Sequence, residues 1–453
     1  MRWGSKMANI NRAAVSASIV AMAVALCAAP VVAQTAGDTT PVAQSTSGAA
    51  QAGGGTAQPD VNASDGADNG QLQEITVTAQ KREQNLSDVG ISVSVLGGAT
   101  LEQLGITDST AIVSAIPNME NLPVYGPGTN ANYSIRGVAQ NDYNDGTESP
   151  VASYIDEVYL VPTGASSFNL HDMERVEVLR GPQGTLFGRN STAGLIHFIT
   201  AKPVFDAFAS GSVQIGSNDT RQATGVVNVP LGEVLALRIS GQIHRNDGWI
   251  DNISGTQPDA GEMKTESIRG QLLFKPNETF RNLAKISYDN AHGATVGNFH
   301  EVTALNPANG DQFLVGPNQN PYGTGNQRDV FGFPNIGSKE TFDSGSPERL
   351  RKGRSILASN RLDIDLGRVS ITSVTGYNKY RRDQLQDCDG TQGRICQAHF
   401  NSFSNQFSQE LRGFADLDGL RITAGLYFLS HKIRLDSIAP LQATSKNSPF
   451  PAR

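Results

Sequence analysis

Few of the reactive or polar residues in the sequence are spaced as they are in known catalytic or ligand-binding motifs. One glycine-rich run comprises Gly181, Gly184, Gly188 and Gly194. Its spacing matches neither of the two common phosphate-binding glycine motifs, so a nucleotide loop is excluded. No serine–histidine–aspartate set or metal-ligand cluster has credible spacing either. We therefore predict that the chain is not an enzyme and holds no metal or other cofactor.

Two arginines and two cysteines remain as candidate functional residues. Arg136 and Arg180 each end a predicted strand and are followed by glycine; in a soluble domain such side chains would simply be solvated. Cys388 and Cys396 lie eight residues apart, and a disulfide between them fits an oxidising compartment. A metal site that includes His399 is the alternative, but one histidine with two cysteines is too little for a closed site.

The composition narrows the class of protein. The 36 Lys and Arg residues against 43 Asp and Glu give a net charge of -7, so no basic field predicts nucleic-acid binding. Outside a soft N-terminal segment, no window offers the ~18 uninterrupted apolar residues of a spanning helix. The 47 glycines in 453 residues favour strands and turns. A transmembrane β-barrel remains possible, because its alternating strands give only a weak hydropathy signal.

The N-terminal region reads as an export signal and a linker. Basic residues, a soft apolar run and small residues before Gln34 predict a signal peptide over 1–33. The alternative, a membrane anchor, is disfavoured by the many Ala and Ser residues and by Pro30. Residues 34–72 have almost nothing to bury and predict a disordered tether. A short β-prone segment over 73–80 follows.

Residues 81–203 predict a small α+β domain. Short apolar runs of strand type alternate there with two short helical segments, and a stretch rich in Gly, Pro, Asn and Asp over 121–150 predicts loops. After Pro203 the pattern changes to long two-faced strands. In one of them Leu235, Leu237 and Ile239 face one side, whereas Ala236, Arg238 and Ser240 face the other.

Such strands suit a bilayer barrel or a soluble sandwich, and the connections between them favour the barrel. Tight turns and long connections alternate strictly over residues 204–453, as in outer-membrane barrels with short periplasmic turns and long outer loops. About nine strands are expected, an odd number that would leave an unpaired edge in lipid. We therefore expect a C-terminally truncated barrel.

The order and motifs of these segments resemble the TonB-dependent outer-membrane receptors over about Gln73 to Lys432. In that family a plug domain fills a barrel of about 22 strands. The motifs that carry the resemblance are Glu74-Ile-Thr-Val-Thr-Ala79, Ile135-Arg-Gly137, Tyr154-Ile-Asp-Glu-Val158, Met173 to Gly188 and Asn190 to Lys202.

The resemblance implies roles for individual residues. The segment Glu74, Ile75, Thr76, Val77, Thr78 and Ala79 corresponds to the TonB box, which adds as a strand to the energising protein TonB. Arg136 and Arg180 become candidates for ion pairs with carboxylates on the barrel wall, and Glu410 is the candidate partner. Because Phe407 and Leu411 would face lipid, Ser408, Glu410 and Arg412 would face the plug. The alternative for Glu410 is a generic lumen carboxylate.

The resemblance also implies a ligand and a location. The cargo would be a scarce nutrient such as an iron–siderophore complex, a cobalamin or a glycan, bound in part by apical loops of the plug. Tyr125, Tyr143 and Asn144 are the expected contacts, and the expected location is the outer membrane of a Gram-negative bacterium. The competing hypothesis is a truncated, non-transporting receptor fragment.

Overall fold

The structure, a computed structural model, describes about two thirds of the chain in several segments. These are residues 76–82, 84–122, 130–140, 145–252, 259–294, 303–305, 312–314, 341–342, 351–387 and 397–438. The predicted signal peptide and tether lie outside them, as do Glu74 and Ile75 of the predicted TonB box. We refer to residues 81–203 as the plug and to the sheet that follows as the wall.

The plug is built on a five-stranded mixed sheet with the order β3-β8-β9-β6-β7. Its strands are β3 (Val93–Gly97), β6 (Val151–Ile155), β7 (Val158–Leu160), β8 (Met173–Arg180) and β9 (Gly194–Thr200). The helices are α2 (Gly98–Gln103), α3 (Gly184–Phe187) and the 3-10 helices η1 (Leu86–Asp88), η2 (Ser109–Ala115) and η3 (Thr163–Ser166). Two small ribbons, β1 (Thr76–Val77) with β2 (Gln84–Asn85) and β4 (Met119–Asn121) with β5 (Tyr133–Ile135), complete it.

The plug has an apolar core of its own between the sheet and the helices. Ile112, Tyr133, Val176, Ile196 and Phe198 are all at most 1% exposed. Both faces of β9 are covered, since every residue of that strand is buried. Apart from His197 and Thr200 the strand is apolar, as a strand covered on both faces requires, and this burial makes the plug a unit that packs on itself.

The wall is a long antiparallel sheet in which chain neighbours pair. Within the described residues its nine long strands are β10 (Phe208–Gly216), β11 (Thr220–Pro230), β12 (Leu235–Asn252), β13 (Ala260–Phe274), β14 (Phe280–Gly293), β18 (Arg351–Asp365), β19 (Val369–Asp387), β20 (Gln397–Leu417) and β21 (Leu420–Ile438). Three short strands lie in the long connections: β15 (Thr303–Leu305) pairs with β16 (Gln312–Leu314), and β17 (Thr341–Phe342) pairs with β12.

Alternation along each wall strand separates an apolar face from a polar one. Val213, Ile215 and Leu426 are 78%, 80% and 77% exposed on the outer face. Gln271 and Gln406 on the opposite face are 1% exposed, because the plug covers them. An apolar outer surface opposite a polar inner surface is the pattern of outer-membrane strands.

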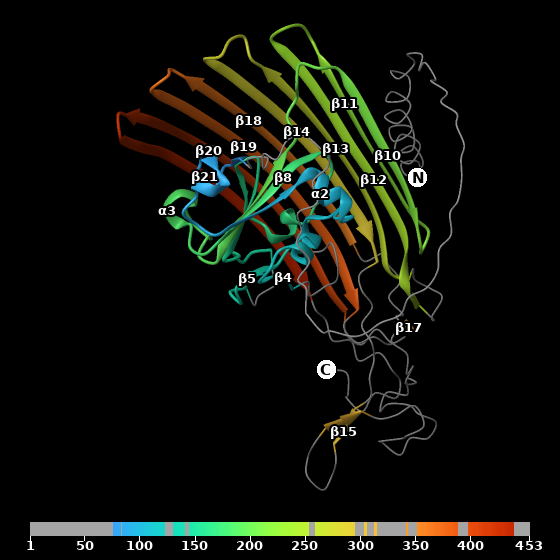
Figure 1. The fold of residues 1–453 in the computed structure, drawn as a ribbon. Helices are drawn as coiled ribbons and strands as arrows, with labels where there is room; N and C mark the ends of the chain where they lie inside the picture. The colour runs from blue at the N-terminus through green and yellow to red at the C-terminus, as the bar shows by residue number, and fades with distance from the viewer. Residues whose placement is uncertain are drawn as a thin grey trace, which may run out of the picture. The chain divides into compact units, whose positions relative to one another are not determined.

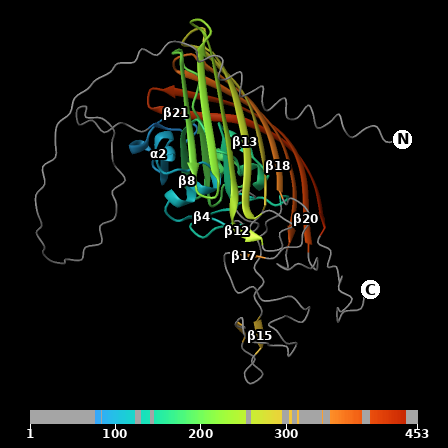
Figure 2. The same cartoon turned by 90° about the vertical axis from the view of Figure 1, so that its right-hand side faces the viewer.

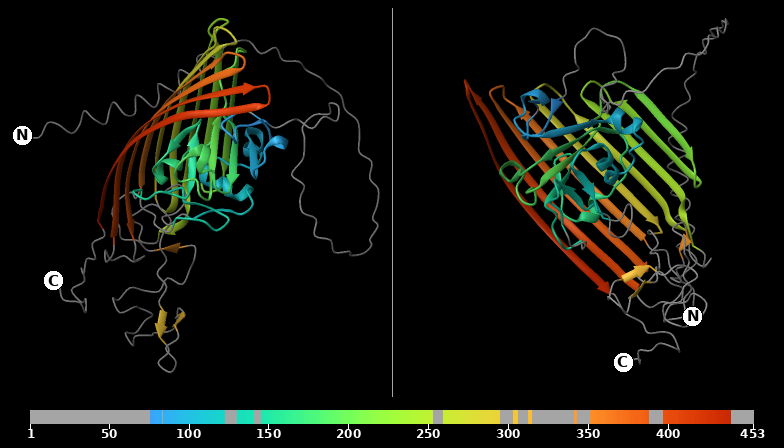
Figure 3. Two further views of the ribbon diagram at one scale, coloured as in Figure 1. Left: turned by 90° about the vertical axis from the view of Figure 1, so that its left-hand side faces the viewer. Right: turned by 60° about the horizontal axis from the view of Figure 1, so that its bottom comes forward.

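Figures 1 and 2 show the wall strands side by side from β10 to β21, with the plug strands β8 and β4 and helix α2 against one face. Figure 3 shows the same curved sheet from two further directions. An α+β plug followed by a nine-stranded antiparallel sheet confirms the predicted fold class. No helix among the described residues has the length and apolar character needed to cross a membrane.

Candidate functional site at the contact of plug and wall

The described part of the predicted TonB box, Thr76 to Ala79, is packed against the plug. Strand β1 pairs with β2 over only two residues. Val77 is 0% and Ala79 is 1% exposed, and both belong to an apolar cluster with Leu179 and Leu195. A two-residue ribbon has few backbone hydrogen bonds to lose, so side-chain burial provides most of the attachment of this segment.

Glu177 on β8 anchors the same segment through polar contacts. The amide of Thr78 donates to its carboxylate over 2.8 Å and the Thr78 hydroxyl over 3.0 Å. Arg175 Nε donates to Glu177 over 2.8 Å, and the ring of His197 lies 4.0 Å away. Burial lowers the pKa of His197 in spite of the nearby carboxylates, so its ring is neutral and accepts the Glu157 amide over 3.1 Å. The sequence signal for Glu177 is a glutamate between Val176 and Val178 in the motif Met173 to Gly188.

A chain of alternating charges joins the plug to the wall near the box. Lys81 Nζ lies 3.0 Å from Glu410, and Arg412 Nη1 lies 3.0 Å from the same carboxylate. Arg412 also pairs with Glu157, which in turn pairs with Arg361. Burial alone would raise the pKa of Glu157, but Arg361, Arg412 and Lys81 outweigh burial and hold the pKa well below its usual range.

The predicted partners of Glu410 were wrong in this structure. Arg136 is exposed in a left-handed turn with φ 54°, and Arg180 donates to the hydroxyl of Ser94 within the plug. Neither arginine forms an ion pair with a described residue. Glu410 does face the plug, but its plug partner is Lys81, which lies two residues after the box.

The hairpin turn between β6 and β7 supplies two carboxylates to the wall. Ile155 pairs with Val158, so Asp156 and Glu157 form a two-residue turn, and their φ angles are 46° and 71°. Asn-Gly is the usual occupant of such turns. A left-handed glutamate is uncommon and costs about 1 kcal/mol or more, a strain that tends to persist at functional sites.

Close packing brings this hairpin onto the wall at Gly376. A Cβ atom on Gly376 would lie 2.6 Å from Val158 Cγ1 and 2.8 Å from Ser408 Oγ. Beside it, Asp156 pairs with Lys285 over 2.8 Å and also accepts from the Thr200 amide over 3.0 Å. Burial acts against ionisation here, yet Lys285 and the Thr200 amide keep the pKa of Asp156 below its ordinary value.

Two further contacts also join an acceptor group of the plug to an arginine of the wall. Asp172 accepts two hydrogen bonds from Arg238, at 2.8 and 2.5 Å, and Arg269 Nη1 donates to the carbonyl of His171 over 3.2 Å. Burial and the neighbouring Arg269 lower the pKa of His171 well below its ordinary value, so no additional positive charge arises there. At Asp156, Glu157 and Asp172 the plug contributes the carboxylate and the wall the cation, the reverse of the predicted arrangement, whereas the Lys81–Glu410 pair has the predicted polarity.

The other end of the contact involves residues next to the apical loops. Asp145 pairs with Arg382 over 3.0 Å and also accepts from the Ser402 hydroxyl. Arg382 donates in addition to the side chain of Asn130. Asn130 and Asp145 directly follow the stretches 123–129 and 141–144. The predicted ligand contacts Tyr125, Tyr143 and Asn144 fall within those stretches, outside the described residues.

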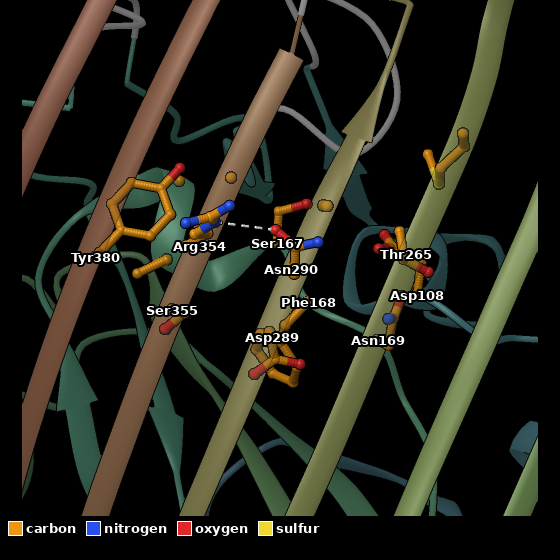
Figure 4. A pocket seen from close by; sticks show the side chains of 15 residues that line it. Asp108, Ser167, Phe168, Asn169, Thr265, Asp289, Asn290, Arg354, Ser355 and Tyr380 are labelled. Atoms are coloured by element: carbon orange, nitrogen blue, oxygen red, sulfur yellow. Dashed lines mark hydrogen bonds between the residues drawn. The ribbon is translucent and has the colours of Figure 1, made fainter. Parts of the chain in front are cut away.

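A small cavity lies between the plug and the wall. Asp108, Ser167 and Asn169 of the plug face Asp289 and Tyr380 of the wall across it (Figure 4). Its volume of about 30 Å³ holds a water molecule and little more, so it is no site for a nutrient ligand. Among the residues that the structure describes, no group of three or more His, Cys, Asp and Glu side chains is arranged to hold a metal ion. Cys388 and Cys396 lie outside the described residues.

In this structure a self-packed plug is held by ion pairs against the polar face of a barrel-type sheet. Residues 85–195 match the family "TonB-dependent Receptor Plug Domain". The chain is 29% identical over 203 residues to the pesticin receptor of Yersinia pestis, covering 42% of this chain and 29% of that protein. It is 29% identical over 225 residues to the iron-regulated outer membrane virulence protein of Vibrio cholerae, covering 45% and 32%.

Solved structures agree on the fold. The ferric yersiniabactin uptake receptor FyuA of Yersinia pestis superposes with a TM-score of 0.60 at 19% identity, covering 78% of this chain and 50% of that one. The siderophore receptor PiuA of Acinetobacter baumannii gives 0.59 at 17% identity, covering 81% and 48%. The chain thus carries a TonB-dependent receptor plug domain over residues 85–195 and shares its fold with these solved receptors. It spans about half the length of these solved receptors and about a third of the curated relatives it matches.

Proposed function

We propose that this chain forms the plug and part of the barrel of a receptor that imports an iron–siderophore complex or a similarly large ligand across the outer membrane. Energy would enter when TonB adds as a strand to residues 74–79 and pulls on the plug. The observation that carries the proposal is the mode of attachment of Thr76–Ala79: a two-residue ribbon, buried Val77 and Ala79, and hydrogen bonds to Glu177.

The position of Lys81 supports the coupling between this segment and the wall. It lies two residues beyond Ala79, and its ammonium is paired with Glu410. A pull on the box would reach this pair before any other described plug–wall ion pair, because the remaining ones lie further along the chain. Lys81, Glu410, Arg412 and Glu157 are therefore the proposed latch, in place of Arg136 and Arg180.

The proposed ligand class follows from the relatives. One matched relative is described as iron-regulated, another as a catecholate siderophore receptor, and the solved neighbours include ferric-siderophore receptors. Tyr125, Tyr143 and Asn144 stay as predicted ligand contacts, and a disulfide between Cys388 and Cys396 stays a prediction. The proposed location is the outer membrane, with TonB and membrane lipid as partners.

The test uses Thr76, an exposed residue whose backbone would pair with TonB. Proline there removes an amide donor and fixes φ, so Thr76→Pro should abolish energised uptake while Thr76→Ala, the matched control, should not. Uptake of radioactive iron would be followed in cells expressing the receptor from its own gene, with catecholate, hydroxamate and phenolate chelates. Uptake of every chelate that is equal in Thr76→Pro, in Thr76→Ala and in cells lacking TonB would overturn the proposal.

A further inference from the structure

Five cations on the inner face of the wall lie at one level, near the tight-turn ends of their strands. They are Arg238 on β12, Arg269 on β13, Lys285 on β14, Arg361 on β18 and Arg412 on β20, and we call them the basic belt. Each lies three to five residues from the strand end that enters or leaves a tight turn.

The strand register confirms that these residues share one level. Arg238 is opposite Gln271, and Gln271 is opposite Lys285. On the neighbouring strand, Arg361 is two residues out of register with Lys285. Across β19, Arg412 is in turn two residues out of register with Arg361. Because side chains alternate between faces with period two, residues in this register point together toward the plug.

The counter-charges of the belt come mainly from the plug. Asp172 pairs with Arg238, Asp156 with Lys285, and Arg269 donates to plug carbonyls. None of these three cations forms an ion pair with a wall carboxylate among the described residues. Within the described part of the wall, Arg361 and Arg412 also pair with Asp363 and Glu410, and the carboxylate of Asp289 attracts Arg269. Withdrawal of the plug would therefore leave the belt with an excess of positive charge on a narrow inner surface.

We propose that the basic belt is a charge filter that favours anionic cargo once the plug has moved. Rings of Arg and Lys side chains select anions in pores, and low-dielectric walls strengthen the field of such a ring. The inference rests on the proposed function and specifies the substrate class: a chelate with net negative charge, whose carboxylate or phenolate oxygens replace Asp156, Glu157 and Asp172 as partners of the belt. A belt that only seats the plug would have no such preference.

The two sides of the same ion pairs offer matched variants. The plug-side variant Asp156→Asn/Asp172→Asn and the belt-side variant Arg238→Gln/Lys285→Gln break the same two contacts, so both should loosen the plug. Receptor purified from the outer membranes of cells carrying its own gene would be placed in planar bilayers, and the reversal potential measured across a KCl gradient. We expect an anion-selective leak from the plug-side variant, and a chloride-to-potassium permeability ratio at least about threefold lower from the belt-side variant.

Two outcomes would overturn the filter. One is equal ion selectivity in the two variants. The other is the absence of any leak even after Asp145→Asn and Glu157→Gln are added to the plug-side variant, because the belt would then not be uncovered by loss of those contacts. Neither measurement involves TonB or uptake, so failure of the filter is distinguishable from failure of the proposed import.

Discussion

The interior of the plug and its contact with the wall are built from opposite chemistry. Inside the plug, Val176, Ile196 and Phe198 are fully buried among apolar neighbours. At the wall, the contacts are ion pairs such as Asp172–Arg238 and hydrogen bonds such as Gln406 to the backbone of Tyr159. Among the described residues of the wall, Leu357, Val374 and the partly buried Leu429 join the apolar clusters of the plug.

The difference shows how a plug can leave its seat without coming apart. Exposing the apolar core of the plug to water would cost free energy in proportion to the apolar area exposed. Separated ions, in contrast, regain hydration that offsets much of the lost Coulomb attraction. A pull on the plug should therefore separate it from the wall, or peel its N-terminal segment, before its sheet is disrupted.

The largest expected effect tests the interior. Phe198→Ala should destabilise the plug by about 3 to 5 kcal/mol, since a large buried ring leaves a cavity. Pulse proteolysis of the purified receptor in a urea series measures the change. Val138→Ala, at a plug position that is 47% exposed, is the control and should shift the transition little. Equal shifts would show that the interior is not what holds the plug together.

The next effect tests the ion pairs at the wall. Glu157→Gln leaves Arg361 and Arg412 without their shared plug partner, which should cost about 3 kcal/mol. The urea concentration at which the plug becomes protease-accessible reports this loss. Adding Arg361→Gln should recover part of it, because the two residues are coupled. Glu120→Gln, at an exposed position on β4, is the control; an additive double variant would contradict the coupling.

A smaller effect concerns the TonB-box segment alone. Glu177→Gln weakens the charged hydrogen bonds to Thr78 and should destabilise that attachment by about 1 to 2 kcal/mol. Hydrogen exchange over residues 76–81, read by mass spectrometry, should then accelerate about tenfold for each 1.4 kcal/mol. Glu174→Gln removes two ion pairs from the same strand, with Arg175 and with Lys202, without touching Thr78 and serves as the control. Equal acceleration of hydrogen exchange in both variants would show that Glu177 does not anchor the segment.

The pH dependence of plug release distinguishes the contribution of the carboxylate ion pairs from that of histidine protonation. A depressed carboxylate pKa contributes stability that is complete above the ordinary value, 4.5 for Glu157, and is lost as pH falls toward the folded value. Asp156 behaves in the same way. The carboxylates should therefore make plug release in urea easier below about pH 4, whereas His171, which burial and Arg269 hold neutral at the contact, should make release easier as pH falls below about 6.5. A step near pH 6.5 thus reports His171, and a step below pH 4 reports the carboxylates.

The sequence predicts well which face of a wall strand each side chain occupies, but it does not predict which plug residue that side chain contacts. Period-two alternation correctly put Phe407 and Leu411 outside and Ser408 and Arg412 against the plug. The partner of Glu410 lies 329 residues away in the chain, and its identity depends on how the whole plug is oriented against the strand register. No local pattern contains that information.

The Asp156–Glu157 turn shows a second kind of miss. Both residues lie in the motif Tyr154 to Val158, which supports the family resemblance, but the charge of the turn was given no role. Two adjacent carboxylates in a predicted tight turn between short apolar strands are an unusual occupant of positions that favour Asn-Gly. That departure from the usual turn residues was the available signal.

The smallest expected effect returns to the arginine that the family resemblance singled out. Arg136 is exposed, has a left-handed backbone and forms no ion pair with a described residue. Arg136→Asn keeps a residue type that tolerates this conformation, so the variant isolates the guanidinium; we expect a change within about 0.5 kcal/mol. Urea release of the plug, compared with Lys81→Gln, measures it. If Arg136→Asn loosened the plug as much as Lys81→Gln, the seated state would use the arginine after all, and the proposed latch would have to be redrawn around it.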